Sequence, residues 1–389
     1  MIQRHIQSQV NRLLQKFPII ALTGPRQSGK TTLCRLLKPD YRYVTLENPD
    51  SRQFARSDPR QFLEVYQNGV IIDEAQNVPE LFSYLQGIVD ERRRPGEYIL
   101  TGSQNFLLLE KITQSLAGRV ALFNLLPFSE HELAETPYAH SNWEDAVVKG
   151  FYPRLYDLDL EPADFFPNYL QTYVERDVRQ LVNVSDLTLF QTFVRICAGR
   201  IGQLLNLAQL GNELGLDAKT VNRWLSVLEA TFIVYRLPPY YRSFQKRLVK
   251  TPRLYFYDVG LAAWLLQIRR PDDLQVHFAR GALFENFVIT ELIKNELNTG
   301  QRPQFYFWRD NIGNEVDLVW EGTAGKLNLL EIKAGRTINN EFFKGIQFLQ
   351  KLEEPARLET SYVVYGGDEG QIRQQATVVP WNRLMTIRG

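Results

Sequence analysis

The sequence GPRQSGKT, residues 24–31, decides the fold, because it lies between a short apolar segment and the helix-forming sequence TTLCRLL. It fits the pattern G-x-x-x-x-G-K-[ST], in which glycines let the backbone curl so that its amide N–H groups face phosphate oxygens. The following helix N-terminus adds partial positive charge. An ordinary glycine-rich turn is the alternative interpretation. We expect the loop to bind ATP, with Lys30 on the β- and γ-phosphates, through Gly24, Gln27, Ser28, Gly29, Lys30, Thr31 and Thr32.

Short apolar segments recur through the first third of the chain and alternate with helical patterns. They lie at residues 18–22, 43–46, 69–72, 98–100 and 120–123. Strands that alternate with helices predict a parallel sheet with helical crossovers. The first 125 residues are therefore expected to form an α/β core of the P-loop NTPase type.

The third of these segments ends in two carboxylates, Asp73 and Glu74. Ligands of a parallel sheet bind at the carboxyl ends of its strands. We therefore expect Asp73 to hold Mg²⁺ together with Thr31, and Glu74 to accept a proton from the attacking water. A small-molecule kinase would share the loop, but Glu74 would have no role in it.

Two later residues are candidates for the same site. Ser103 follows the segment at 98–100 and is expected to sense the γ-phosphate, although a plain polar turn is the alternative. Arg119 precedes the segment at 120–123 and is expected to act as an arginine finger on a neighbouring subunit's nucleotide, which would make the protein a homo-oligomer. A surface ion pair is the other interpretation of Arg119.

The ordered motifs GPRQSGKT, VIIDEAQ, ILTGSQ and LAGR resemble the AAA+-type ATPases of bacteria and archaea that carry a DUF4143 C-terminal region. The resemblance extends to YVERDV, TPRLYFYDVGL and GALFENFV, and so covers nearly the whole chain. It implies a nucleotide-driven machine of a kind often suspected in DNA metabolism or defence.

The remainder of the chain is expected to form a helical lid at 126–185, a winged helix at 186–270 and a further α/β domain at 271–389. Residues 205–214 and 218–230 read as a helix pair around a glycine-containing turn, with Asp217 as N-cap. The segment 236–253 then contains six basic residues and no acidic one. DNA is the expected partner, through Lys219, Asn222, Arg223, Arg242, Lys246, Arg247 and Lys250. Alternatively, the helix pair is a spacer between domains, and the basic segment, which reads as a hairpin, forms ion pairs with acidic neighbours.

A second candidate site lies near the C-terminus, at Asp317, Glu331 and Lys333. The separation of Asp317 and Glu331 suits adjacent antiparallel strands, and Glu331 and Lys333 share a face because they differ by two. The two carboxylates, completed by Glu285 from an upstream helix, are expected to hold Mg²⁺ against a phosphodiester. Lys333 would position water or stabilise developing charge.

This ordered set resembles the PD-(D/E)xK restriction-endonuclease-like fold, although Val316 stands where many members have proline. Such a domain either cleaves nucleic acid or is retained as a binding module, and the sequence leaves both open. Glu315 is expected on the opposite strand face from Asp317, in a structural role.

Composition narrows the class of protein. Lys and Arg number 45 against 44 Asp and Glu, which excludes a polybasic coat over the whole chain. Two cysteines and four histidines argue against a disulfide framework or a structural zinc, and no apolar run approaches a membrane span. We expect a reduced, cytoplasmic protein without a membrane partner: an ATP-hydrolysing motor or switch that engages DNA. The alternative is a signalling or scaffold ATPase whose C-terminal modules only bind partners.

Overall fold

The computed structural model describes residues 2–103, 115–173, 178, 186–240 and 251–387. Contacts group the chain into two units. The N-terminal unit consists of Met1–Phe128, Ala230–Phe232 and Leu297–Gln301, and the C-terminal unit of Ser129–Glu229, Ile233–Glu296 and Arg302–Gly389. The division into four domains expected from the sequence stays a prediction.

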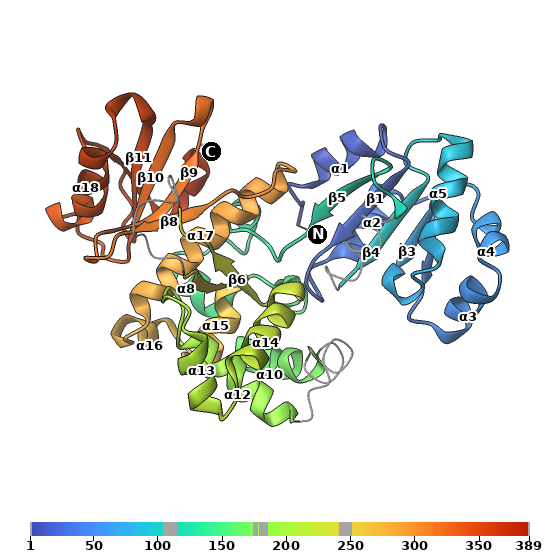
Figure 1. Cartoon of the computed structure of the whole chain (residues 1–389), viewed down its shortest axis with the longest axis horizontal. Coiled ribbons are helices and arrows are strands. Elements are labelled where there is room, and N and C mark those ends of the chain that lie inside the picture. Colours follow the sequence, from blue (N-terminus) through green and yellow to red (C-terminus); the bar gives the residue numbers. More distant parts are fainter. Residues whose placement is uncertain (1, 104–114, 174–177, 179–185, 241–250, 388–389) are drawn as a thin grey trace. The chain divides into compact units, whose positions relative to one another are not determined.

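The N-terminal unit is built on a five-stranded parallel sheet in the order β2-β3-β4-β1-β5 (Figure 1). All five predicted strands are confirmed, as β1 (Ile19–Thr23), β2 (Arg42–Thr45), β3 (Val70–Asp73), β4 (Tyr98–Gly102) and β5 (Val120–Asn124). The helices are α1 (Gln7–Leu14), α2 (Lys30–Leu37), α3 (Pro49–Ser57), α4 (Pro59–Val65) and α5 (Leu81–Arg92).

Apolar residues on both faces explain why this sheet is covered on both sides. Along β1, Ile19 and Ala21 pack into the cluster formed with α3, α4 and α5, whereas Ile20 and Leu22 pack into the cluster formed with α1 and α2. Successive side chains of a strand point to opposite faces, so a strand buried on both sides reads as a continuous apolar run. Helices consequently cover each face, and the carboxyl ends of the strands stay open at one edge.

The first half of the C-terminal unit is helical, as predicted for the stretch after residue 125. Its helices are α7 (Glu130–Ala134), α8 (Trp143–Lys149), α9 (Pro153–Asp157), α10 (Pro162–Tyr173), α12 (Leu187–Ala198), α13 (Leu207–Leu214) and α14 (Ala218–Ala230). The predicted pair corresponds to α13 and α14, and the Asp217 carboxylate accepts the Thr220 N–H at 2.9 Å as an N-cap. The antiparallel strands β6 (Val234–Leu237) and β7 (Arg253–Phe256) follow.

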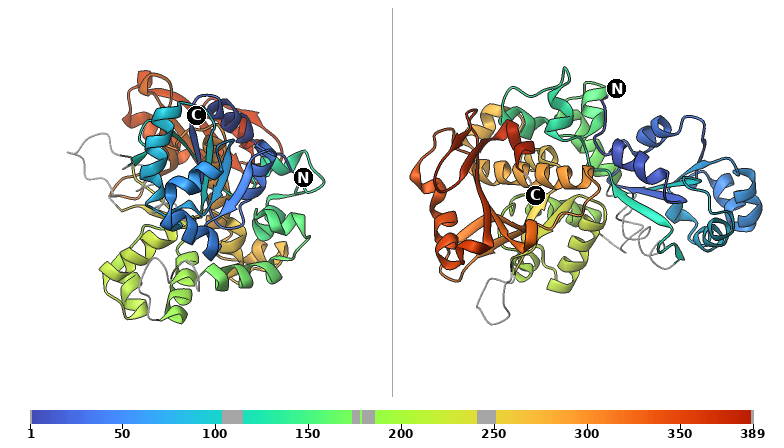
Figure 2. Two further views of the ribbon diagram at one scale, coloured as in Figure 1. Left: turned by 90° about the vertical axis from the view of Figure 1, so that its right-hand side faces the viewer. Right: turned by 90° about the horizontal axis from the view of Figure 1, so that it is seen from above.

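A six-stranded mixed sheet forms the second half, in the order β12-β13-β11-β10-β9-β8. Its strands are β8 (Tyr306–Arg309), β9 (Glu315–Glu321), β10 (Leu327–Lys333), β11 (Leu358–Tyr365), β12 (Gln371–Ile372) and β13 (Thr377–Pro380). The associated helices are α15 (Val259–Leu265), α16 (Pro271–Val276), α17 (Arg280–Asn298) and α18 (Lys344–Leu352). Figure 2 shows α17 beside this sheet. Leu292 and Glu296 of α17 line a pocket together with Phe305 and Trp320.

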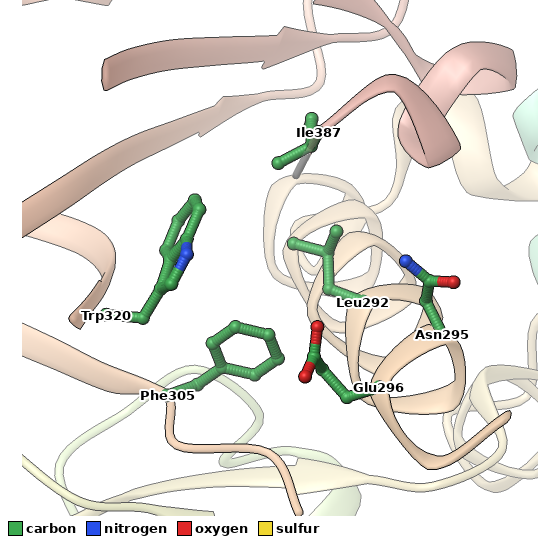
Figure 3. Close-up of a pocket in the computed structure, with 6 residues that line it drawn as sticks. All are labelled: Leu292, Asn295, Glu296, Phe305, Trp320 and Ile387. Atoms are coloured by element: carbon green, nitrogen blue, oxygen red, sulfur yellow. The ribbon is translucent and has the colours of Figure 1, made fainter. Parts of the chain in front are cut away.

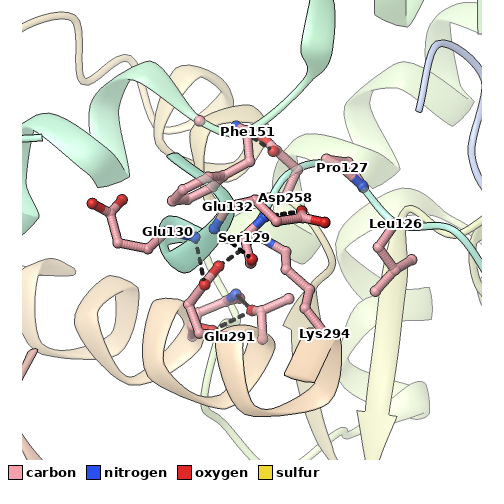
Figure 4. A network of polar contacts seen from close by, with 12 residues as sticks. Leu126, Pro127, Ser129, Glu130, Glu132, Phe151, Asp258, Glu291 and Lys294 are labelled. Carbon is pink, nitrogen blue, oxygen red and sulfur yellow. Dashed lines mark hydrogen bonds and ion pairs between the residues drawn. The ribbon is translucent and has the colours of Figure 1, made fainter. Parts of the chain in front are cut away.

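A buried polar network connects α7, α17 and Asp258 within the C-terminal unit (Figure 4). The Glu130 N–H donates to Glu291 Oε2 at 2.7 Å, and Lys294 Nζ donates to Glu291 Oε1 at 2.7 Å. Asp258 accepts the Phe151 N–H at 2.8 Å. Each buried charge therefore has a partner, as buried ionised groups require.

Two further sequence features have a place in this fold. Cys34 and Cys197 are both free and buried, and burial raises the pKa of each thiol. In the part of the chain that the structure describes, no helix combines the length and the apolar character needed to cross a bilayer.

Candidate functional site

The loop GPRQSGKT connects β1 to α2 at the open edge of the parallel sheet. Gly24 has φ of +153°, and a Cβ there would lie 2.1 Å from the Leu125 carbonyl oxygen, so no side chain fits. Gly29 precedes α2 with φ of +92°, and Gln27 is exposed in the left-handed region at φ of +61°. These conformations curl the loop in front of the helix N-terminus, as the motif predicts.

Lys30 and Ser28 are the buried polar residues of this loop. Lys30 Nζ donates to the carbonyl oxygens of Gly24 at 2.9 Å and Pro25 at 2.8 Å, and its residue is 7% exposed. Burial lowers the pKa of Lys30, while the carboxylates of Glu74 and Asp73 oppose that shift. The Ser28 hydroxyl is buried and has no hydrogen-bond partner among the described residues. A buried cation and an unsatisfied hydroxyl suit an anionic ligand at this loop.

Asp73 ends β3 directly across from the loop. Its Oδ2 lies 3.4 Å from Thr31 Oγ1 and accepts the Tyr43 hydroxyl at 2.6 Å, and Thr101 Oγ1 donates to its Oδ1. Thr31 and Asp73 therefore present adjacent oxygen atoms, which is the donor chemistry that Mg²⁺ prefers. The pair fits the predicted Mg²⁺ site, while Thr32 is exposed on α2.

Glu74 and Ser103 are brought together by the ends of β3 and β4. Glu74 has φ of +53°, and its Oε2 accepts Ser103 Oγ at 3.1 Å and the Ser103 N–H at 3.4 Å. Gln76 Nε2 donates to the same oxygen. The predicted base and the predicted phosphate sensor are thus in direct contact.

Arg119 is placed in an ion pair within its own unit. Its Nε and Nη2 donate to the two Asp90 carboxylate oxygens at 2.5 and 2.7 Å, and both side chains are partly exposed. The ion-pair interpretation therefore describes Arg119 in the single chain. Its role as a finger on another subunit stays a prediction.

Sequence patterns missed several residues that hold this site. Arg4 is buried and donates to the carbonyl oxygens of Ser28 at 2.9 Å and Leu126 at 2.7 Å, which fixes the outer side of the loop. Tyr43 and Thr101 hold Asp73 from the neighbouring strands. Strand pairing puts Thr45, the last residue of β2, level with Asp73. A polar residue at the end of a neighbouring strand is thus the sequence signal that favours contacts with Asp73. No comparable signal marks Arg4.

The C-terminal candidates also come together, on β9, β10 and α17. Strands β9 and β10 are antiparallel, as predicted, and Lys333 Nζ donates to Asp317 Oδ2 at 3.3 Å and to Glu331 Oε2. Glu331 and Lys333 therefore share a face, which confirms the period-two argument. Glu285 lies on α17.

An arginine that was not predicted to belong to this second site lies among its carboxylates. Arg253 is 3% exposed, and its Nη1 lies 3.4 Å from Glu285 Oε1 and 3.7 Å from Asp317 Oδ1. Its Nη2 donates to Glu315 Oε2 at 2.5 Å. The expectation that Glu315 faces away from Asp317 is wrong, because residues two apart on a strand share a face and both contact Arg253.

The charged groups of this cluster shift one another's pKa values. Burial and the Asp317 carboxylate raise the pKa of Glu285 to about 7. Burial, together with Asp317, also raises the pKa of Glu331 well above its ordinary value. Although burial opposes it, Lys333 and Arg253 lower the pKa of Asp317. Among Glu285, Asp317 and Glu331, Asp317 is therefore the one whose surroundings favour the ionised form.

The carboxylates of this cluster are paired with cationic side chains in the structure. Across residues 2–103, 115–173, 178, 186–240 and 251–387, the structure contains no group of three or more His, Cys, Asp or Glu side chains placed to hold a metal ion. Arg253 and Lys333 contact the oxygens that the predicted Mg²⁺ would need.

The predicted DNA-binding residues are described only in part. Lys219, Asn222 and Arg223 are exposed on α14, whereas Val221 and Leu225 are buried, as expected for a helix with one free face. Arg242, Lys246, Arg247 and Lys250 lie outside the described residues.

Both ends of the basic segment pair with carboxylates. Arg236 pairs with Glu229 through Nε and Nη2 and also donates to Asn222 Oδ1, and Arg253 belongs to the cluster described above. The alternative of pairing with acidic neighbours is thus correct for these two residues.

A small pocket in the C-terminal unit contains none of the predicted site residues (Figure 3). Its lining is mostly apolar, and the Trp320 Nε1 is buried there without a partner among the described atoms. Burial raises the pKa of Glu296 in its wall. The lining residues are Leu292, Asn295, Glu296, Phe305, Trp320 and Ile387.

Family models match three successive segments of the chain. Residues 16–134 match an AAA domain, residues 140–272 match a domain of unknown function, DUF8612, and residues 280–384 match a second one, DUF4143. The AAA match covers the loop, Asp73, Glu74, Ser103 and Arg119. The resemblance to AAA+-type ATPases with a DUF4143 region is confirmed at this level.

Two mycobacterial proteins align with almost the whole chain. They are the uncharacterized proteins Rv2008c of Mycobacterium tuberculosis and Mb2031c of Mycobacterium bovis, each 30% identical over 389 residues, covering 99% of this chain and 85% of the relative.

Solved structures match this chain at lower similarity. The Walker-type ATPase PABY2304 of Pyrococcus abyssi has a TM-score of 0.45 at 15% identity, covering 67% of this chain and 94% of that chain. RuvB of Thermotoga maritima has a TM-score of 0.31 at 15% identity, covering 61% of this chain and 90% of that chain.

Proposed function

This chain belongs to one family with Rv2008c of Mycobacterium tuberculosis and Mb2031c of Mycobacterium bovis. We propose that it is an ATPase that engages DNA. The AAA domain would bind ATP with Mg²⁺ and hydrolyse the γ-phosphate, and the C-terminal unit would contact DNA. No cleavage step is part of this proposal.

One observation carries the ATPase proposal: the loop and the two strand-end carboxylates meet at one edge of the sheet. Thr31 Oγ1 and Asp73 Oδ2 are 3.4 Å apart, and Lys30 is buried within the loop beside them. Ser28 offers an unpaired hydroxyl in the same loop. Phosphate oxygens and an oxygen-ligated cation would satisfy all of these groups.

The residues of the chain would divide the work of hydrolysis. Lys30 would leave the carbonyls of Gly24 and Pro25 for the β- and γ-phosphates, and Glu74 would accept the proton of the attacking water. Thr31 and Asp73 would hold Mg²⁺, which neutralises charge on the phosphates when bound. Ser103, bonded to Glu74 Oε2, would link the presence of a γ-phosphate to the orientation of the base.

The proposal of DNA engagement is supported by the exposed face of α14. Lys219, Asn222 and Arg223 lie on this face, whereas Val221 and Leu225 on the other side of the helix are buried. Basic side chains on an exposed helix face suit contact with phosphates and groove edges.

Two substitutions test the ATPase. Lys30→Ala should abolish ATP binding, whereas Glu74→Gln should keep ATP binding and lower the hydrolysis rate by ~10²-fold or more, as expected for loss of a general base. ATP affinity is measured by calorimetry and turnover by phosphate release. The matched controls are Lys16→Ala and Glu80→Gln, which remove the same groups from exposed positions of the same unit.

If Glu74→Gln hydrolyses ATP at the wild-type rate, Glu74 is not the base. If Lys30→Ala binds ATP as the wild type does, the loop is not the nucleotide site and the ATPase proposal fails. A scaffold ATPase is distinguished by a turnover rate that DNA leaves unchanged.

A further inference from the structure

A buried arginine shares the space of the C-terminal carboxylates. Arg253 begins β7, while its partners Glu285 and Asp317 come from α17 and β9. Its Nη1 lies 3.4 Å from Glu285 Oε1 and 3.7 Å from Asp317 Oδ1, and Nη2 donates to Glu315 at 2.5 Å. One guanidinium therefore contacts carboxylates from two other elements.

The remaining space around Asp317 is also taken. Lys333 Nζ donates to Asp317 Oδ2 at 3.3 Å and the Ile332 N–H donates to the same oxygen at 2.8 Å. Gly345 of α18 packs tightly against Glu331. Any side chain at position 345 would collide with it, because a Cβ there would lie 1.9 Å from Glu331 Oε1. Little room is left in which the carboxylates could rearrange around an ion.

A divalent cation would have to displace the guanidinium. Mg²⁺ needs oxygen ligands at ~2.1 Å in near-octahedral geometry, and the positive charge of a guanidinium on the same carboxylates would repel it. Arginine stays protonated in proteins, and Arg253 cannot leave by losing its charge. Its guanidinium also lies 4.8 Å from the centre of the Phe307 ring. Moving a buried, unpaired guanidinium elsewhere is costly.

We propose that Arg253 takes the place of a divalent cation in the cluster of Glu285, Glu315 and Asp317. The cluster is then an ionic joint that connects β7 to α17 and β9, and not a metal-dependent cleavage centre. The C-terminal sheet would accordingly contribute binding rather than cleavage. This inference is independent of the ATPase proposal, because it concerns other residues and no nucleotide.

Metal binding by the full chain tests the proposal directly. Mn²⁺ is titrated into the nucleotide-free protein and bound ion is counted by electron paramagnetic resonance, in the wild type and in Asp317→Asn. The amide keeps an oxygen that can accept the Ile332 N–H. We expect both proteins to bind the same number of Mn²⁺ ions. One ion bound by the wild type and lost in Asp317→Asn would overturn the proposal.

The converse experiment removes the arginine. Arg253→Met should create a site for one additional Mn²⁺ ion per chain, and the double variant Arg253→Met/Asp317→Asn should lose it again. Arg236→Met is the matched control, because Arg236 lies on β6 and pairs with Glu229 outside the cluster. A folded Arg253→Met protein that gains no Mn²⁺ would contradict the proposal. If this variant does not fold, the comparison of wild type with Asp317→Asn still decides.

Discussion

Glu285 shows how the position of one carboxyl group sets a pH dependence. Its pKa is raised from 4.5 to about 7 by burial and by Asp317. The folded state therefore binds the proton more tightly than the unfolded state, so the stabilisation is complete below about 4.5 and is lost as pH rises through about 7. Glu285 alone should therefore contribute a fall of up to ~3 kcal/mol in the unfolding free energy between these limits, since one pKa unit corresponds to ~1.4 kcal/mol.

Glu285→Gln removes this titration, so the unfolding free energy of the variant should fall less steeply with rising pH. Urea unfolding at several pH values between 5 and 8 measures it, with Glu341→Gln, an exposed glutamate on the same unit, as the control. The slope of unfolding free energy against pH is compared, and not its absolute value, because the substitution also weakens the contact with Arg253. Equal slopes in the wild type and Glu285→Gln would show that Glu285 titrates normally.

Individual residues were predictable where a local pattern carries the chemistry. The loop residues and Asp73 follow from a contiguous motif and from a strand that ends in a carboxylate, and the structure brings them together. Arg4 and Arg253 were not predictable, because their partners are separated from them by up to 123 and 64 residues respectively. Contacts at that range depend on the tertiary fold, which a single sequence does not display.

Among the elements, α14 carries the described part of the proposed DNA interface. Each phosphate contact releases counterions, so the logarithm of the binding constant falls with the logarithm of salt concentration by ~0.9 per contact on duplex DNA. The double variant Lys219→Ala/Arg223→Ala should lower the magnitude of this slope by ~2 if both side chains contact phosphates. Fluorescence anisotropy with duplex DNA at several salt concentrations provides the measurement.

The matched control is Lys326→Ala/Lys351→Ala, which removes two exposed positive charges from the C-terminal sheet region. An equal loss of slope in this control would mean that net charge, and not α14, determines binding. An unchanged slope in Lys219→Ala/Arg223→Ala would exclude α14 from the interface.

Strands and helices were predicted well because their signals are local. Each of the five apolar segments of the first third is a strand of the parallel sheet, and Asp217 caps α14 as its position suggests. The error at Glu315 came from the face assigned to it, because alternation along β9 puts it beside Asp317. Pairing of the basic segment with acidic neighbours was one of the two alternatives, but the partners of Arg236 and Arg253 could not be identified, because the segment itself contains no acidic residue.

At the scale of the whole molecule, the order β2-β3-β4-β1-β5 puts β1 between strands that are distant in sequence. The alternation of strands and helices predicts a parallel sheet, but it leaves the order of the strands undetermined. The assembly of several chains is equally undetermined, because the only sequence feature that favours it is Arg119. In the single chain its Nε and Nη2 donate to Asp90, and its Nη1 donates to the Ala117 carbonyl oxygen.

A mixing experiment distinguishes a trans-acting Arg119 from a local ion pair. If Arg119 reaches a neighbouring nucleotide, Arg119→Ala should bind ATP but hydrolyse it slowly, and Asp90→Asn should retain activity because it only releases the arginine. Lys30→Ala cannot bind ATP but keeps its arginine. In a head-to-tail assembly, mixing Arg119→Ala with Lys30→Ala in equal amounts should restore ~25% of the wild-type turnover, from interfaces that combine an intact loop with an intact arginine. Phosphate release across mixing ratios measures it. An active Arg119→Ala protein, or a mixture no faster than its components, would show that Arg119 serves only the ion pair with Asp90.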